Sequence, residues 1–196
     1  SFLPGCGESF DDAYNAFRSP KNSAPAVSIQ DTSGWQTSPV TVIGSATDSD
    51  NDSLSCRWSE ITSYGLTFTA PDSFSTGIAF TGNANGDVAV NAVIRLTVSD
   101  GEDESYHDMN LQIYRNDVIF VTPDGTGSGN HPESPLQGGH AADLAYAISY
   151  AKDSGKTIVA LSAGTYEIST TPASPALILK EGISLYGGYA SSDWKR

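Results

Sequence analysis

The sequence is poor in basic residues and in long apolar runs, and each shortage excludes a class of function. Its 196 residues contain 10 Lys and Arg against 23 Asp and Glu, a formal net charge of −13. A chain of this charge without a basic stripe repels phosphate backbones, which excludes nucleic acid as a partner. No run approaches the roughly 18 apolar residues that a membrane helix needs.

Only two cysteines are present, Cys6 and Cys56. They would form a disulfide in an oxidising compartment if the fold brings them together. Cys6 has a second interpretation, because Leu3-Pro4-Gly5-Cys6 resembles the lipobox of bacterial lipoproteins, in which such a cysteine is lipidated. A processed lipoprotein would lack the residues before Cys6, which counts against processing here. This anchor would be the chain's one link to a membrane.

Motifs that carry catalysis are also missing. The histidines, His107, His131 and His140, lack the His-x3-His or Cys-x2-Cys spacing of zinc sites, and solvated loop histidines are the simpler interpretation. The glycine-rich segment 125–129 lacks the lysine of a phosphate-binding loop and is interpreted as a flexible loop. No nucleophile elbow occurs. We therefore expect no enzyme here; any catalytic residues would lie beyond Arg196.

The polar residues that are present favour short strands and turns. Between residues 25 and 114, segments rich in β-branched residues alternate with clusters of Gly, Asn, Asp and Ser. The ~90 residues involved are close to the size of an antiparallel immunoglobulin-type sandwich. An N-terminal arm, residues 1–21, precedes them and contains a predicted short helix over 8–18.

The pattern changes again from residue 116. Segment 118–122 predicts a strand, segment 141–153 predicts an amphipathic helix that ends near Gly155, and further short strands follow within 157–168 and 176–189. The intervals between the later strands are too short for alternating βαβ units. A solenoid of parallel coils fits better.

Residues 22–114 resemble the PKD-like family of immunoglobulin-type sandwiches. Four motifs carry the resemblance in the family's order: Asn22-Ser23-Ala24-Pro25-Ala26, the acidic turn 46–54, Arg57-Trp58 with Trp58 in the core, and the strand and turn 96–101. One departure is Asn51, where the family usually has Gly. Asn tolerates left-handed backbone, so the turn should survive.

Some members of that family hold a calcium ion at these turns. The resemblance implies that Asn22, Asp48, Asp50 and Asp100 converge on Ca²⁺ with the backbone oxygen of Ser23, and Asp52 is a further candidate. Carboxylates crowded at 48, 50 and 52 repel one another without a cation, and Ca²⁺ accepts several oxygen ligands. The alternative is a turn whose side chains bond their own backbone. The spacing is not that of an EF-hand.

Residues 117–190 resemble the N-terminal end of right-handed parallel β-helix proteins, the pectate-lyase-like superfamily. The matching parts are the opening strand 119–125, Pro135, the capping helix 141–153, Ala163-Gly164-Thr165-Tyr166, and the next coil 182–189. Many such proteins bind or cleave polysaccharide, and many others are adhesins. A β-helix normally needs about three or more coils. Roughly two are expected here, and an open coil end invites addition of a strand.

We therefore expect a mainly β chain: an immunoglobulin-like antiparallel β-sandwich over 22–115, then the first coils of a right-handed parallel β-helix with one capping α-helix over 116–196. The leading hypothesis is an extracellular or cell-surface structural or adhesion module that assembles, as a filament in the special case, through strand or coil addition. Its partners would be other chains or surface polysaccharide. The alternative is the N-terminal fragment of a polysaccharide-active or carbohydrate-binding β-helix protein. Candidate sugar-stacking residues are Trp35, Tyr64, Tyr186, Tyr189 and Trp194.

Overall fold

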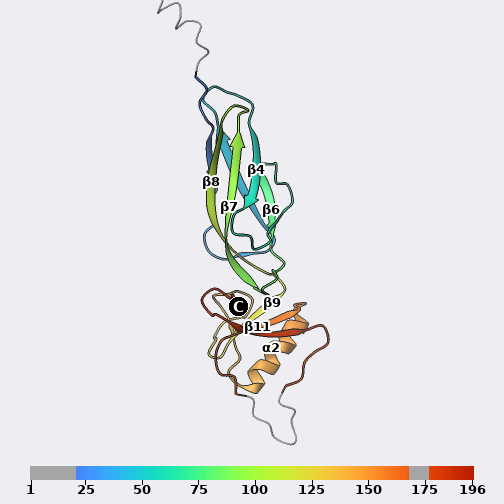
Figure 1. The fold of residues 1–196 in the computed structure, drawn as a ribbon. Helices are drawn as coiled ribbons and strands as arrows, with labels where there is room; N and C mark the ends of the chain where they lie inside the picture. The colour runs from blue at the N-terminus through green and yellow to red at the C-terminus, as the bar shows by residue number, and fades with distance from the viewer. Residues whose placement is uncertain (1–20, 168–176) are drawn as a thin grey trace, which may run out of the picture.

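The computed structural model describes residues 21–167 and 177–196 as two units stacked end to end (Figure 1). The chain enters at the far end of the first unit, and its C-terminus lies at the junction between the units. The helix predicted over 8–18 falls outside the described residues. Within them, no helix is both long and apolar enough to cross a membrane.

The first unit is a sandwich of two sheets. One sheet has the order β1 (Ala26–Ile29), β3 (Val40–Thr47), β6 (Ser75–Ala79), β5 (Thr67–Phe68), with every pair antiparallel. The other has the order β2 (Gln36–Thr37), β8 (Glu104–Tyr114), β7 (Ala89–Ser99), β4 (Ser55–Glu60), in which only β2 and β8 are parallel. Chain crossings between the sheets give the immunoglobulin-type arrangement, and the predicted sandwich is confirmed.

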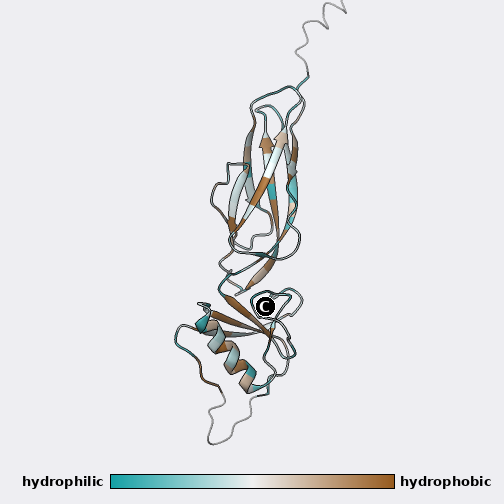
Figure 2. Ribbon diagram, turned by 180° about the vertical axis from the view of Figure 1, so that it is seen from behind, coloured by the Kyte–Doolittle hydropathy of each residue, from teal (hydrophilic) through white to brown (hydrophobic). Residues whose placement is uncertain are grey.

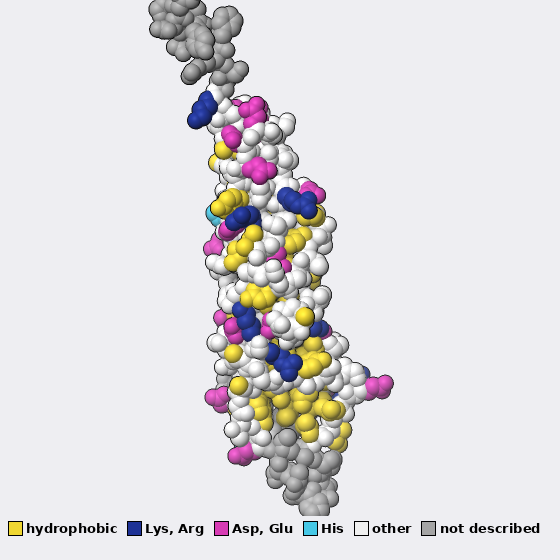
Figure 3. Space-filling model, in the orientation of Figure 1, with side chains coloured by type: hydrophobic (Ala, Val, Ile, Leu, Met, Phe, Trp, Pro, Cys, Tyr) yellow, Lys and Arg dark blue, Asp and Glu magenta, His cyan; other side chains and the backbone are white. Residues whose placement is uncertain are grey.

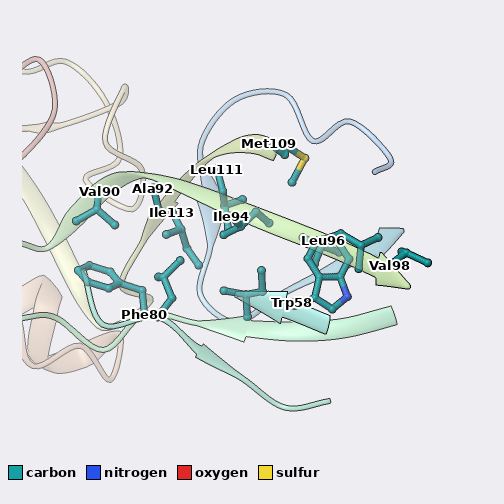
Figure 4. Close-up of a cluster of buried hydrophobic side chains, with 13 residues drawn as sticks. Trp58, Phe80, Val90, Ala92, Ile94, Leu96, Val98, Met109, Leu111 and Ile113 are labelled. Carbon is teal, nitrogen blue, oxygen red and sulfur yellow. The ribbon is translucent and has the colours of Figure 1, made fainter. Parts of the chain in front are cut away.

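Alternation of side chains along β7 builds the sandwich core. Successive side chains in a strand point to opposite faces, so every second residue of β7 faces inward. Trp58 from β4 is buried among them, as predicted, and its indole Nε1 donates a hydrogen bond to the carbonyl of Ser73 (2.9 Å). Figure 4 shows this cluster, which includes Val90, Ala92, Ile94, Leu96 and Val98 from β7 and Met109, Leu111 and Ile113 from β8.

The second unit is a parallel sheet with a helix on one face. Its order is β10 (Leu136–Gln137), β9 (Val118–Thr122), β11 (Ile158–Ser162), β12 (Ser184–Tyr189), and α2 (Ala141–Asp153) follows β10 in the chain. The predicted helix and strands are confirmed. The apolar face of α2, Leu144, Ala147, Ile148 and Ala151, packs on the sheet. The β-helix stays a prediction, since what is seen is one parallel sheet.

All five residues of β9 are buried because the two faces of the sheet meet different cores. Ile119 and Val121 face α2, whereas Val118 and Phe120 face the sandwich. Figure 2 shows the strands beside the helix in the second unit as largely hydrophobic, whereas the sandwich strands mix hydrophobic and polar residues. A strand buried on both faces reads as a continuous apolar run, which is the pattern of VIFVT.

The glycine-rich loop after β9 is densely paired. The N–H of Gly127 donates to the carbonyl of Pro135 (2.8 Å), and that of Gly129 donates to the carbonyl of Ser134 (2.8 Å). A Cβ atom on Gly127 would lie 2.2 Å from Ser134 Oγ, so only glycine fits. This packing argues against the flexible loop expected from composition. Close approach of backbone, rather than mobility, explains these glycines.

A shared hydrophobic cluster joins the two units. The sandwich contributes Val88, Ala89 and Tyr114, and the second unit contributes Val118, Phe120, Ile158, Ala160, Tyr189 and Trp194. In the connection, Arg115 makes a bidentate pair with Asp117 (2.9 and 2.7 Å). Burial raises the pKa of Asp117, but hydrogen bonds from Arg115 and Thr157 outweigh it and leave that pKa below its ordinary value. The units therefore form one elongated body.

Candidate functional site

Three carboxylates gather at the β3–β4 turn, at the end of the sandwich remote from the second unit. Oxygens of Asp48, Asp50 and Asp52 lie within 4.8 Å of one another. Asp48 Oδ1 accepts the backbone N–H groups of Asp50 (2.8 Å) and Asp52 (3.4 Å), which closes the turn. Asn51 has a φ of 61°, so it adopts the left-handed conformation expected of it.

The second oxygen of Asp48 sets this turn apart from an ordinary one. Asp48 Oδ2 is buried and accepts no hydrogen bond from the residues that the structure describes. A buried carboxylate oxygen without a partner is costly, and its neighbours Asp50 and Asp52 add like-charge repulsion. A hard divalent cation relieves both problems, because it binds carboxylate oxygens at irregular loop geometry. The residues present therefore fit a calcium ion.

Asn22 and Asp100 form a second group. The Asn22 amide donates to Asp100 Oδ2 (3.0 Å) and Asp103 Oδ2 (3.1 Å). Asp100 Oδ1 accepts the backbone N–H groups of Glu102 (2.8 Å) and Asp103 (2.7 Å). The Asp103 N–H, the Asn22 amide and the Glu102 N–H together hold the pKa of Asp100 below its ordinary value. Asp100 Oδ1 is thus engaged within the β7–β8 turn, and Asp100 Oδ2 is engaged by Asn22 from the segment before β1.

The first segment of the sandwich ties the two groups together. The backbone N–H of Ser23 donates to Asp50 Oδ2 (2.8 Å), while Asn22 next to it reaches Asp100. The family resemblance named the backbone oxygen of Ser23 as a ligand, which stays a prediction, and it did not foresee the hydrogen bond from the Ser23 N–H to Asp50. It also missed Asp103. The acidic stretch that follows Asp100 was the signal that could have found it.

Of the five candidate sugar-stacking residues, Tyr186 is the most exposed. Trp194 and Tyr189 are fully buried in the junction cluster, and Trp35 packs against it. Tyr64 is half-buried, and its hydroxyl accepts a hydrogen bond from Lys195 Nζ (3.0 Å). Tyr186 on β12 is 41% exposed. It lines a cleft of about 390 Å³ between the units, together with the sandwich loop after β6.

The histidines and cysteines take separate places. The ring of His131 packs edge-to-face on Tyr114 (5.4 Å between centroids), and His140 Nδ1 lies 3.6 Å from Glu167 Oε2. Neither belongs to a cluster of metal-ligating side chains within the described residues. Cys56 is half-buried on β4. Its burial, and to a smaller extent the negative charge of Asp72, raises the pKa of its thiol. Cys6 lies outside the described residues, so its pairing and lipidation stay predictions.

No family model and no curated protein matches the chain. Among the solved structures that are similar to it, two match 55% of the chain. Human protocadherin-24 EC1-2 is 17% identical with a TM-score of 0.33, and the match covers 57% of that chain. The protocadherin GammaB4 extracellular domain is 13% identical with a TM-score of 0.31, and the match covers 20% of that chain. At these scores the likeness carries no argument, and the sandwich assignment rests on the strand pairing described above.

Proposed function

We propose that this chain is a non-enzymatic structural or adhesion module of an extracellular or cell-surface protein. The junction cluster is the observation that carries the proposal. Because buried residues of both units share one hydrophobic core, the module is a rigid spacer with different surfaces at its two ends. The remote end bears the acidic turns, and the other end bears the parallel sheet (Figure 1).

The parallel sheet supports assembly through strand addition. β12 is the last strand of the sheet as described, so its outer edge offers backbone groups for pairing. The segment of the chain that leads into β12 carries two large apolar side chains that are exposed, Ile178 (60%) and Leu179 (59%). Figure 3 shows hydrophobic side chains gathered over this unit on one face. We propose that a further coil or strand covers this surface, either from a continuing right-handed β-helix or from another chain.

Assembly predicts concentration-dependent mass. In sedimentation velocity, the unmodified chain should form larger species as its concentration rises, because burial of Ile178 and Leu179 removes apolar surface from water. Ile178→Lys should keep it monomeric. The matched control is Ile43→Lys on the sandwich, where Ile43 is 48% exposed, and it should assemble normally. A monomer at every concentration would rule out self-assembly.

We further propose that Asp48, Asp50 and Asp52 hold Ca²⁺, which neutralises their charges and fixes the turn against the Ser23 segment. Calcium should then raise the melting temperature. A ligand that binds only the folded state at a hundred times its Kd contributes about 2.7 kcal/mol. Asp48→Asn should lose this response, since Asn can still accept the two turn hydrogen bonds but offers no second carboxylate oxygen.

The control for the calcium prediction is Asp31→Asn, which changes an exposed acid outside the cluster. It should keep the full response to calcium and to its removal by a chelator. Equal melting temperatures with calcium and with chelator in the unmodified chain would contradict the proposal. An undiminished calcium response in Asp48→Asn would contradict it as well.

One observation favours a second candidate function. Tyr186 lies exposed in the cleft between the units, which suits the N-terminal part of a carbohydrate-binding or polysaccharide-active β-helix protein. For this second function, the rigid body would position a glycan-binding cleft, and the outer edge of β12 would not be the binding surface. Retention of the chain on a polysaccharide gel would support it.

A further inference from the structure

We propose that the cleft between the two units binds a saccharide that carries an anionic group, with Arg196 and Tyr186 as the recognising side chains. The cleft has a volume of about 390 Å³ and lies between the Asn83–Val88 loop and strands β11 and β12. Small-molecule sites typically measure about 300–1,000 Å³ and often lie between domains. The inference deepens the proposed surface role by giving it a ligand class.

Arg196 supplies the charge that selects an anion. Three other arginines within the described residues each pair with a carboxylate: Arg57 with Asp72, Arg95 with Asp108 and Arg115 with Asp117. Arg196 makes no such pair there. A guanidinium matches the two oxygens of a carboxylate or sulfate group and binds them bidentately. The cleft therefore has one cation available for an incoming ligand.

The position of Arg196 is fixed by its surroundings. Its backbone N–H donates to Asp87 Oδ1 (3.1 Å), and Asp87 Oδ2 accepts the Asn83 amide (2.8 Å). Asp87 is buried, and both of its carboxylate oxygens already accept these hydrogen bonds. The Arg196 guanidinium carbon lies 5.6 Å from the ring centroid of Tyr186 and 5.5 Å from that of Tyr189. Such cation–π contacts hold the guanidinium beside the rings.

Tyr186 supplies an aromatic platform for the sugar ring. Its side chain is 41% exposed and lines the cleft, so a sugar ring can reach it. The wall behind it is firm, because the buried Tyr189 donates its hydroxyl to the carbonyl of Gly86 (2.8 Å). Burial raises the pKa of Tyr189, which keeps this hydroxyl a donor. Exposed Ser184 adds a hydroxyl beside the platform.

Calorimetric titration of the whole chain tests the site. The probes are tetrasaccharides of hyaluronan, chondroitin sulfate and alginate, with neutral chitotetraose as the comparison. The three anionic probes share the carboxylate, and chondroitin sulfate separates a sulfate preference from a carboxylate preference. We expect at least one anionic probe to bind about tenfold or more tightly than chitotetraose, because a charged hydrogen-bonded pair adds roughly that factor.

Variants locate the binding. Arg196→Ala and Tyr186→Ala should each weaken the anionic probe about tenfold, and Arg196→Lys should lose less. Tyr106→Ala is the matched control, because Tyr106 is an exposed tyrosine under Arg95 (3.7 Å) whose charge Asp108 already neutralises. It should change nothing. Circular dichroism verifies that each variant is folded.

The inference is overturned if no anionic probe binds at millimolar concentration, if chitotetraose binds as well, or if Tyr106→Ala weakens binding as much as Tyr186→Ala. These outcomes are independent of the assembly test. A monomeric chain that binds the anionic probe would refute self-assembly and support the saccharide site. A chain that assembles but binds no probe would support self-assembly and refute the saccharide site.

Discussion

Replacing Trp194 with alanine is expected to uncouple the two units and to leave the sandwich folded. The Trp194 side chain is 1% exposed and packs edge-to-face on Phe120, with 4.8 Å between ring centroids. Its indole Nε1 donates to the carbonyl of Pro132 (3.0 Å). Removing a buried tryptophan costs about 3–5 kcal/mol. Trp194 belongs to the junction cluster and not to the sandwich core, so this loss falls on the junction.

The residues after Trp194 make the uncoupling more complete. Lys195 Nζ donates to the hydroxyl of Tyr64, and the Arg196 backbone donates to Asp87, both in loops of the sandwich. Those contacts depend on Trp194 to hold the segment down. Differential scanning calorimetry should show one cooperative unfolding transition for the unmodified chain and two for the Trp194→Ala variant. The transition at the higher temperature should be the unfolding of the sandwich.

Tyr146→Ala is the control for this experiment, since Tyr146 is an exposed aromatic on α2. It should keep a single transition. A Trp194→Ala variant that also melts once, with less than about 1 kcal/mol lost, would mean that the junction does not depend on this side chain.

The sequence predicted the parts of the fold that repeat locally. Alternation along 93–98 predicted a half-buried strand, and β7 is one; spacing of Leu144, Ala147, Ile148 and Ala151 predicted the buried face of α2. These patterns follow from the periods of strand and helix. The junction has no such period. Tyr189 bonds Gly86 across 103 positions, and Arg196 bonds Asp87 across 109, so their meeting depends on how the two units dock.

The acidic site illustrates a different limit. The motifs shared with PKD-like sandwiches implied that Asn22, Asp48, Asp50 and Asp100 converge at one end of the sandwich. They did not show that the Asn22 amide would pair with Asp100 and Asp103, or that Asp48 Oδ2 would be left without a donor. Such choices depend on atomic positions within two turns, because a hydrogen bond fails beyond about 3.5 Å. Candidate ligands could be predicted, and their grouping could not.

Gly44→Ala is expected to destabilise the sandwich by about 1–3 kcal/mol or more, although alanine usually suits a strand better than glycine. A Cβ at Gly44 would lie 2.2 Å from Leu96 Cδ2 and 3.1 Å from Trp58 Cζ2. Gly44 lies in β3 and those side chains come from the opposite sheet, so the added methyl group pushes the two sheets apart. Urea unfolding should show a lower midpoint. Gly187→Ala, at a position with open space, should not change it.

A double variant separates this clash from a backbone effect. Leu96→Ala alone should cost about 2–5 kcal/mol by leaving a cavity. Combined with Gly44→Ala, it removes the atom that the new methyl group meets, so the pair should lose less stability than the sum of the single changes. Residues in contact commonly couple by about 0.5–3 kcal/mol. If the stability losses of the two single changes simply add, the cost of Gly44→Ala lies in the backbone of β3 and not in a clash with Leu96. If the double variant loses less than the sum, glycine is needed at position 44 because Leu96 and Trp58 fill the space between the sheets.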